Sequence, residues 1–174
     1  MNTLEQTMIV VLGDRPNPVM EDFLAGCPHV RRWPRAASTR GIPDARNEIV
    51  RWFMQRCTGL AFLLQLDDDM FPTTEGMEAL LASEADVAGA AVLRDGPCGQ
   101  KYQHDHQGGF ACPCVRLSRR ALSVLGSSPF ANQYDRNGRV RCCECRNLWN
   151  TCMRLSKQQH RWLQPAVLGT IRHP

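Results

Sequence analysis

The sequence predicts an α/β fold in which helices cover both faces of a mainly parallel sheet. Three apolar runs of strand length, residues 7–12, 60–66 and 86–93, are separated by stretches with helical spacing. Apolar runs without alternation are typical of strands buried on both faces, and their alternation with helices is typical of parallel sheets. We therefore expect one α/β/α sandwich that binds its ligands beyond the carboxyl ends of the strands.

The size of the chain fits a single domain. It has 174 residues, 43% of them hydrophobic, which is enough to bury a core. The longest apolar stretches are much shorter than the roughly 20 residues that span a bilayer, so no membrane span is expected. The N-terminus lacks the basic and apolar regions of a signal peptide. We therefore expect a cytoplasmic protein, in which disulfides are rare.

The first half of the chain is expected to alternate between strands and helices. The elements are a strand over 7–12, helices over 19–25 and 44–59, a strand over 60–66, a helix over 73–81 and a strand over 86–93. Asp44 is the expected N-cap of the second helix, and Thr73 or Thr74 caps the third. The strand over 7–12 ends at Gly13 and should lie in the centre of the sheet.

The second half is less regular. We expect a loop over 94–109, a strand over 110–117, a short helix over 119–125, a polar segment rich in turns over 127–141, a helix over 144–157 and an extended segment over 162–171. Ser118 is the expected N-cap of the short helix.

Charge divides the chain into two unlike parts. Residues 1–100 carry 9 Lys/Arg against 14 Asp/Glu, whereas residues 101–174 carry 12 against 3. The acidic part can hold a cation, and the basic part suits nucleic acid or the phosphates of a nucleotide. A basic face without a specific partner explains the same asymmetry equally well.

Three carboxylates, Asp67, Asp68 and Asp69, follow the apolar strand over 60–66. Burying them would be costly unless a cation compensates their charge. Residues i and i+2 of an extended chain project to the same side, so we expect Asp67 and Asp69 to face one divalent ion and Asp68 to point elsewhere. Carboxylate oxygens favour magnesium or manganese, which also bind diphosphate. A solvated turn is the alternative.

The residues around this triplet resemble the GT-A glycosyltransferases. Asp44-Ala45-Arg46-Asn47 resembles the family's helix start, and Phe62 to Asp69 resembles the strand that ends in its Asp-x-Asp metal motif. Gly108 to Cys112 and Val115 to Arg120 resemble the acceptor-side strand. The resemblance covers most of the chain and implies a compact, metal-dependent glycosyltransferase. Its cofactors would be Mn²⁺ or Mg²⁺ and a nucleotide-sugar donor, for which we expect a UDP-sugar.

The same resemblance implies roles for individual residues. The metal would be held by Asp67, Asp69 and His173, with Asp69 also counted as catalytic. The donor would be contacted by Gly13, Asp14, Arg46, Asp67 and Asp68. Glu144 resembles the start of the family's Glu-Asp motif, whose carboxylate activates the acceptor hydroxyl in inverting members. Cys145 stands where the aspartate of that motif would be.

Cysteines and histidines gather in the basic part. The candidates for a structural zinc site are Cys98, His104, His106, Cys112, Cys114, Cys142, Cys143 and Cys145. Thiolates and imidazoles are zinc ligands, but the spacing lacks the usual Cys-x-x-Cys pairs. Structural zinc, buried free thiols and, less expected in this compartment, disulfides are all open.

Two functions follow from these features. The first is a glycosyltransferase, with residues 1–100 binding sugar-nucleotide and metal and residues 101–174 binding the acceptor. A compact transferase of this kind resembles virus-encoded enzymes that glycosylate hydroxymethylated bases of DNA in the infected host cell, with the base flipped out of the duplex. Tyr102, Tyr134, Trp149 and Trp162 are candidates to stack on such a base. The alternative is a zinc-stabilised nucleic-acid-binding module without catalysis.

Overall fold

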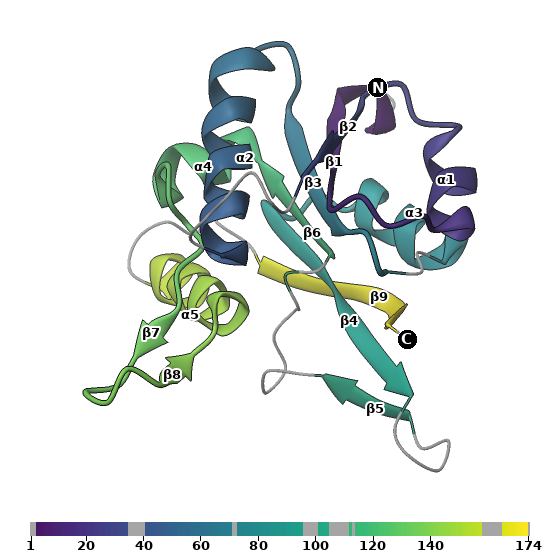
Figure 1. The fold of residues 1–174 in the computed structure, drawn as a ribbon. Helices are drawn as coiled ribbons and strands as arrows, with labels where there is room; N and C mark the ends of the chain where they lie inside the picture. Colours follow the sequence, from purple (N-terminus) through teal and green to yellow (C-terminus); the bar gives the residue numbers. More distant parts are fainter. Residues whose placement is uncertain are drawn as a thin grey trace.

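The computed structural model describes residues 3–34, 41–70, 73–95, 101–104, 112, 114–157 and 165–173, with the backbone alone at 74, 91–95, 101–104 and 165–173. Within these residues, seven strands form one mixed sheet, in the order β2-β1-β3-β6-β4, with β5 and β9 both paired to β4 (Figure 1). The strands are β1 Thr7–Leu12, β2 Val30–Trp33, β3 Phe62–Asp67, β4 Val87–Asp95, β5 Lys101–His104, β6 Cys114–Ser118 and β9 Pro165–His173. The predicted α/β fold class is confirmed.

Four strands of the sheet end at the same edge. β1 is parallel to β2 and β3, and β4 is parallel to β9. Because β6 is antiparallel to both β3 and β4, those two strands run in the same direction. The carboxyl ends of β1, β3, β4 and β9 therefore lie at the same edge, where ligands bind in sheets of this kind.

Helices cover both faces of the sheet (Figure 1). One face packs against α2, α4 and α5, and the other against α1 and α3. The helices are α1 Pro18–Leu24, α2 Ile42–Arg56, α3 Thr74–Ala82, α4 Arg119–Leu125 and α5 Glu144–Lys157, with a short 3₁₀ turn η1 at Leu4–Gln6. A separate hairpin, β7 Gln133–Tyr134 with β8 Val140–Cys142, precedes α5. No helix in the described residues is long and apolar enough to cross a membrane.

The buried strands have apolar side chains on both faces, as their sequences predict. In β1, Val10 and Leu12 join the core on the α2 side, whereas Ile9 and Val11 join the core on the α1 side. Each of these four side chains is fully buried. This arrangement explains the absence of a polar and apolar alternation in the sequence of β1.

Most of the predicted helices have the expected ends. Thr73 caps α3 by accepting a hydrogen bond from the N–H of Gly76, and Ser118 caps α4 by accepting one from Ala121. The prediction of Asp44 as an N-cap is wrong, because α2 begins at Ile42 and Gly41 is its N-cap. Asp44 lies in the first helical turn, where its negative charge still favours the helix.

Two strands of the main sheet were not expected from the sequence. β2 and β5 lie outside the central strands and contain the polar segments Val30–Trp33 and Lys101–His104, which lack the apolar run of a buried strand. β5 lies within the predicted loop over 94–109, so that prediction is wrong for these residues. The predicted strand over 110–117 is observed only from Cys114 onward, and its earlier residues lie largely outside the described part of the chain.

Several cysteines belong to the two cores. Cys112, Cys145 and Cys152 are buried on the α2 side, and Cys114 is buried on the α1 side. Burial raises the pKa of Cys114 to about 12 and that of Cys152 to about 12. These thiols are therefore protonated at neutral pH and behave as small apolar side chains.

The buried thiols predict a loss of stability in alkali. Unfolded thiols release their protons near pH 9.0, whereas Cys114 and Cys152 keep theirs to about 12 in the folded protein. In this window the unfolded state holds fewer protons, so the free energy of unfolding should fall by about 1.4 kcal/mol per pH unit for each thiol. Urea unfolding between about pH 8 and about pH 11 measures this slope.

The double variant Cys114→Ala, Cys152→Ala is the control for the contribution of other titrating groups. It should be less stable at neutral pH but show a shallower loss of stability above pH 9. An unchanged slope in the double variant would contradict the assignment of the effect to these two thiols.

Candidate functional site

The acidic triplet forms a turn at the carboxyl end of β3. The strand ends at Asp67, and the N–H of Met70 donates to the carbonyl of Asp67 at 3.2 Å across the turn. The expectation that an extended chain carries Asp67 and Asp69 to the same side is therefore wrong in its premise, because Asp68 and Asp69 are not in the strand. The directions of the three carboxylates depend on their contacts instead.

Asp68 points toward the loop after β1. Its side chain accepts a hydrogen bond from the backbone N–H of Arg15 at 2.9 Å, and the residue is only 2% exposed. Gly13 allows this approach: a Cβ at that position would lie 2.0 Å from Oδ2 of Asp68, and its φ of +121° is itself unfavourable for other residues. Both residues were predicted to contact the donor, yet here they contact each other.

Asn17 joins the same two loops and was missed in the sequence. Its Nδ2 donates to the carbonyls of Asp68 at 3.2 Å and Met70 at 2.7 Å, and its Oδ1 accepts from the N–H of Met20. One buried side chain therefore caps α1 and holds the acidic turn. The Asn17-Pro18 pair is a recognisable helix start, so the cap was predictable from the sequence, whereas the contacts with the turn were not.

Asp67 forms a buried ion pair with Arg46 of α2. Nη2 of Arg46 lies 2.8 Å from Oδ1 of Asp67, and the two side chains are 1% and 10% exposed. Burial, the largest influence, lowers the pKa of Arg46, but the negative charge of Asp67 and weaker contributions from nearby groups outweigh it and leave the pKa raised. The side chain predicted to meet the diphosphate is thus turned inward. Within the described residues, Nε and Nη1 of Arg46 have no hydrogen-bond partner.

Asp69 is the most accessible carboxylate of the turn. Its side chain is 17% exposed and lies 3.4 Å from Nη1 of Arg15, a side chain that is itself 66% exposed. Such a long contact with an exposed arginine contributes little to stability. Asp14, also predicted to contact the donor, is exposed in the neighbouring β1 loop.

The donor set fits a hard divalent cation only in part. Asp67 and Asp69 supply carboxylate oxygens at the carboxyl edge of the sheet, which suits magnesium or manganese. His173 ends β9 at register with Arg94 of β4, so its backbone lies at the same edge, but its side chain is outside the described atoms. Among the described residues, no group of three His, Cys, Asp or Glu is arranged to hold a metal.

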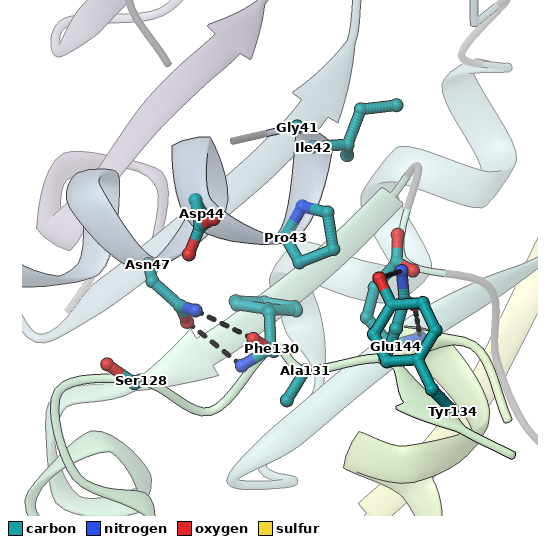
Figure 2. Close-up of a pocket in the computed structure, with 11 residues that line it drawn as sticks. Gly41, Ile42, Pro43, Asp44, Asn47, Ser128, Phe130, Ala131, Tyr134 and Glu144 are labelled. Atoms are coloured by element: carbon teal, nitrogen blue, oxygen red, sulfur yellow. Dashed lines mark hydrogen bonds between the residues drawn. The ribbon is translucent and has the colours of Figure 1, made fainter. Parts of the chain in front are cut away.

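A cavity of about 650 Å³ opens between the start of α2 and the chain segment that leads to α5 (Figure 2). Asp44 and Asn47 project into the region from α2, and Tyr134 and Glu144 lie across from them. Its lining consists of Gly41, Ile42, Pro43, Asp44, Asn47, Ser128, Phe130, Ala131, Asn132, Tyr134 and Glu144. The structure thus places Glu144, the predicted base, in the wall of a cavity.

Asparagine side chains fix the walls of this cavity. Asn47 is bonded twice to the backbone of Phe130: its Nδ2 donates to the carbonyl at 2.6 Å, and its Oδ1 accepts from the N–H at 2.9 Å (Figure 2). Oδ1 of Asn132 accepts from the N–H of Glu144 at 2.9 Å, which caps α5. Nδ2 of Asn147 donates to the carbonyl of Ala131. These side chains form hydrogen bonds with backbone N–H and C=O groups of Phe130 and Ala131, which are not part of a strand.

Arg46 connects the acidic turn with the cavity. Its guanidinium carbon lies 5.8 Å from the ring centre of Phe130, which lines the cavity, and its Nη2 binds Asp67. Glu144 is close enough to contribute to the raised pKa of Arg46. The acidic turn and the cavity therefore lie on two sides of one buried cation.

The described zinc candidates are divided between the two faces of the sheet. Cys114 packs on the α1 side of the sheet and Cys145 on the α2 side, so a single ion cannot bind both. Cys112 donates its backbone N–H to Sγ of Cys145 at 3.1 Å, an ordinary core contact. Cys142 and Cys143 are partly buried near the start of α5. Cys98, His106 and the side chain of His104 lie outside the described atoms, so their part of the prediction is not tested.

Replacing Gly13 with alanine should disturb the acidic turn. The variant combines an unfavourable φ with a clash against the Asp68 carboxylate, so the free energy of unfolding should fall by about 2–4 kcal/mol in denaturant titrations. Two control variants separate the cost of the unfavourable φ from the cost of the clash with Asp68. Gly126→Ala has an unfavourable φ of +82° but nothing within 4 Å of the new Cβ, so it should show the backbone cost alone, about 1–3 kcal/mol. Gly59→Ala has open space and should be nearly neutral. Equal costs at Gly13 and Gly126 would contradict the contact with Asp68.

Comparison with known proteins shows similarity of fold without similarity of sequence. No family model and no characterised protein matches this sequence. Among solved structures, A197 from STIV superposes with a TM-score of 0.57 at 14% identity, covering 96% of this chain and 81% of that chain. A glycosyltransferase involved in the glycosylation of the major capsid of PBCV-1 gives a TM-score of 0.41 at 10% identity, covering 88% of this chain and 68% of that one. The likeness to A197 shows a shared fold, and the second likeness is too distant to carry an argument.

Proposed function

We propose that this protein is a metal-dependent glycosyltransferase that moves a sugar from a nucleotide diphosphate to an acceptor hydroxyl. The observation that carries the proposal is the position of the acidic turn, at the carboxyl edge of the sheet beside a cavity lined by Glu144. Carboxylates at a ligand-binding edge can hold a cation, and a cavity with a carboxylate can hold a second substrate. Sugar transfer needs both.

On the donor side, Asp69 and Asp67 are the proposed metal ligands, with His173 as the third. When bound, the divalent ion neutralises the charge that develops on the departing diphosphate. Arg46 holds Asp67 in place through their 2.8 Å ion pair and adds positive charge behind it. Asp14, exposed in the β1 loop, is the proposed contact for the nucleoside. A UDP-sugar is the expected donor.

On the acceptor side, Glu144 is the proposed general base. Its carboxylate takes the proton from the acceptor hydroxyl while the hydroxyl oxygen attacks the anomeric carbon of the sugar. The bond from that carbon to the diphosphate breaks, and the nucleoside diphosphate leaves with the bonding electron pair. The backbone of Glu144 is fixed by Asn132, and its side chain faces the cavity, which suits a base that must meet a bound hydroxyl.

Asp69→Asn should remove metal-dependent binding of the donor. The amide keeps the shape of the side chain but lacks the charge that attracts Mn²⁺, so UDP with Mn²⁺ should no longer raise the melting temperature. Release of UDP from a UDP-sugar should fall by at least about a hundredfold. Calorimetric titration and a thermal-shift assay measure the two effects. Asp22→Asn, on the exposed face of α1, is the matched control and should behave as the wild type.

Full activity of Asp69→Asn would refute the metal site. A second result would refute the whole proposal: a melting temperature that responds to nucleic acid but not to Mn²⁺ with any nucleotide sugar. That outcome would favour the non-catalytic nucleic-acid-binding module.

Glu144→Gln should slow sugar transfer without lowering the affinity for the donor. Loss of the base lowers kcat by about 10²- to 10⁴-fold, whereas the affinity for UDP with Mn²⁺ should not change. Release of UDP with water as the acceptor gives a measurable rate even before the natural acceptor is known. The cap of α5 uses the backbone of Glu144, so the variant should keep its melting temperature. Unchanged kcat would exclude Glu144 as the base.

A further inference from the structure

We infer that the cavity beside α2 takes a neutral carbohydrate as the acceptor, in preference to the nucleic acid considered from the sequence. This inference rests on the proposed function and names the substrate class of its second site. It depends on three properties of the cavity: the charge of its walls, the kind of hydrogen bond they offer, and one exposed aromatic ring.

The walls are acidic. Asp44 and Glu144 both line the cavity, and none of the described lining residues is a lysine or an arginine. Two carboxylates within one cavity repel a phosphate group, and they do so more strongly where the protein excludes water. The cavity of about 650 Å³ is within the usual range of small-molecule sites. The nearby cation, Arg46, is already paired with Asp67. The two carboxylates of the lining therefore favour a ligand without negative charge.

The hydrogen-bonding groups of the walls also favour a sugar. The carboxylate oxygens of Asp44 and Glu144 accept hydrogen bonds, which suits a ligand with donor groups. A carbohydrate presents several hydroxyl donors, whereas a phosphate diester presents none. The amide of Asn47 is already bonded at both ends to Phe130, so its role is to support the wall.

Tyr134 supplies a surface on which a sugar ring can stack. It is 60% exposed and lies beside Glu144 (Figure 2). Its hydroxyl lies 3.5 Å from Nδ2 of Asn132. The adjacent turn is rigid, because Oδ1 of Asp135 accepts hydrogen bonds from the N–H groups of Asn137 and Arg139. An aromatic face that is held still loses little entropy when the apolar face of a pyranose packs on it.

The competing acceptor, DNA, would use a different surface. Arg136, Arg139 and Arg141 are exposed on the hairpin of β7 and β8, and none of them lines the cavity. A duplex with a flipped base would place its phosphates against such cations, and its affinity would fall with salt. A DNA acceptor should therefore need the arginines for binding, whereas a carbohydrate acceptor should need Tyr134.

The test uses a panel of methyl glycosides, added to the full chain in the presence of Mn²⁺ and UDP, with binding followed by saturation-transfer NMR. At least one glycoside should bind with an affinity that is insensitive to salt. Tyr134→Ala should weaken it about threefold to tenfold, and Tyr134→Phe should preserve it because the ring remains. Arg139→Gln should have no effect.

Two results would overturn the inference. The first is the absence of saturation transfer to every glycoside at millimolar concentration. The second is tight, salt-sensitive binding of a duplex that contains 5-hydroxymethylcytosine, lost in Arg139→Gln and not displaced by the glycosides. In either case, Asp69-dependent binding of Mn²⁺ with UDP would still support the proposed transferase. If Mn²⁺ with UDP does not bind in this way, the transferase itself is refuted, whatever the acceptor.

Discussion

The buried ion pair between Arg46 and Asp67 determines how the site is built. Asp67 ends β3 on the face that packs against α2. Side chains two residues apart in a strand share a face, so Leu63, Gln65 and Asp67 lie on one side. That side faces α2, because Leu63 belongs to the α2-side core and Nε2 of Gln65 donates to the carbonyl of Arg46. A carboxylate in this position needs a cation within the protein, and Arg46 supplies it at 2.8 Å. Removing either partner would leave a buried charge without its counter-ion, at a cost of about 3–5 kcal/mol. The pair thereby links the end of a strand, the first turns of α2 and the ring of Phe130.

From this pair outward, the three carboxylates of the turn have three different environments. Asp67 is held by α2, Asp68 is held by the β1 loop through Arg15 and Gly13, and Asp69 is left as the most exposed of the three side chains. Asn17 adds two more hydrogen bonds between the loop after β1 and the acidic turn. A rigid turn with one accessible carboxylate is a suitable place for a cation that must be bound and released with a nucleotide. The cavity proposed for the acceptor lies beyond the ring of Phe130, and Asp44 and Glu144 are the carboxylates of its lining.

The sequence was sufficient for the elements that follow simple periodicity. β1, β3 and β4 were recognisable as apolar runs, and α5 was predicted over the residues at which it is observed, Glu144–Lys157. The polar strands β2 and β5 could not be predicted, because strands away from the centre of a sheet need no continuous apolar run. At the site, the prediction that Asp67 and Asp69 face the same side while Asp68 points elsewhere was reasoned from an extended chain that in fact turns. The inward direction of Arg46 and the clasp between Asn47 and Phe130 depend on residues far apart in sequence, so no local pattern could indicate them.

The proposed donor site can be tested by locating Mn²⁺ by anomalous diffraction in crystals grown with Mn²⁺ and UDP. We expect one strong peak at about 2.1 Å from a carboxylate oxygen of Asp69, adjacent to the diphosphate, with Arg46 still paired to Asp67. His173 should lie within the same coordination sphere. A nucleotide bound elsewhere, or a metal bound by cysteines with none at the acidic turn, would refute a donor site at the acidic turn.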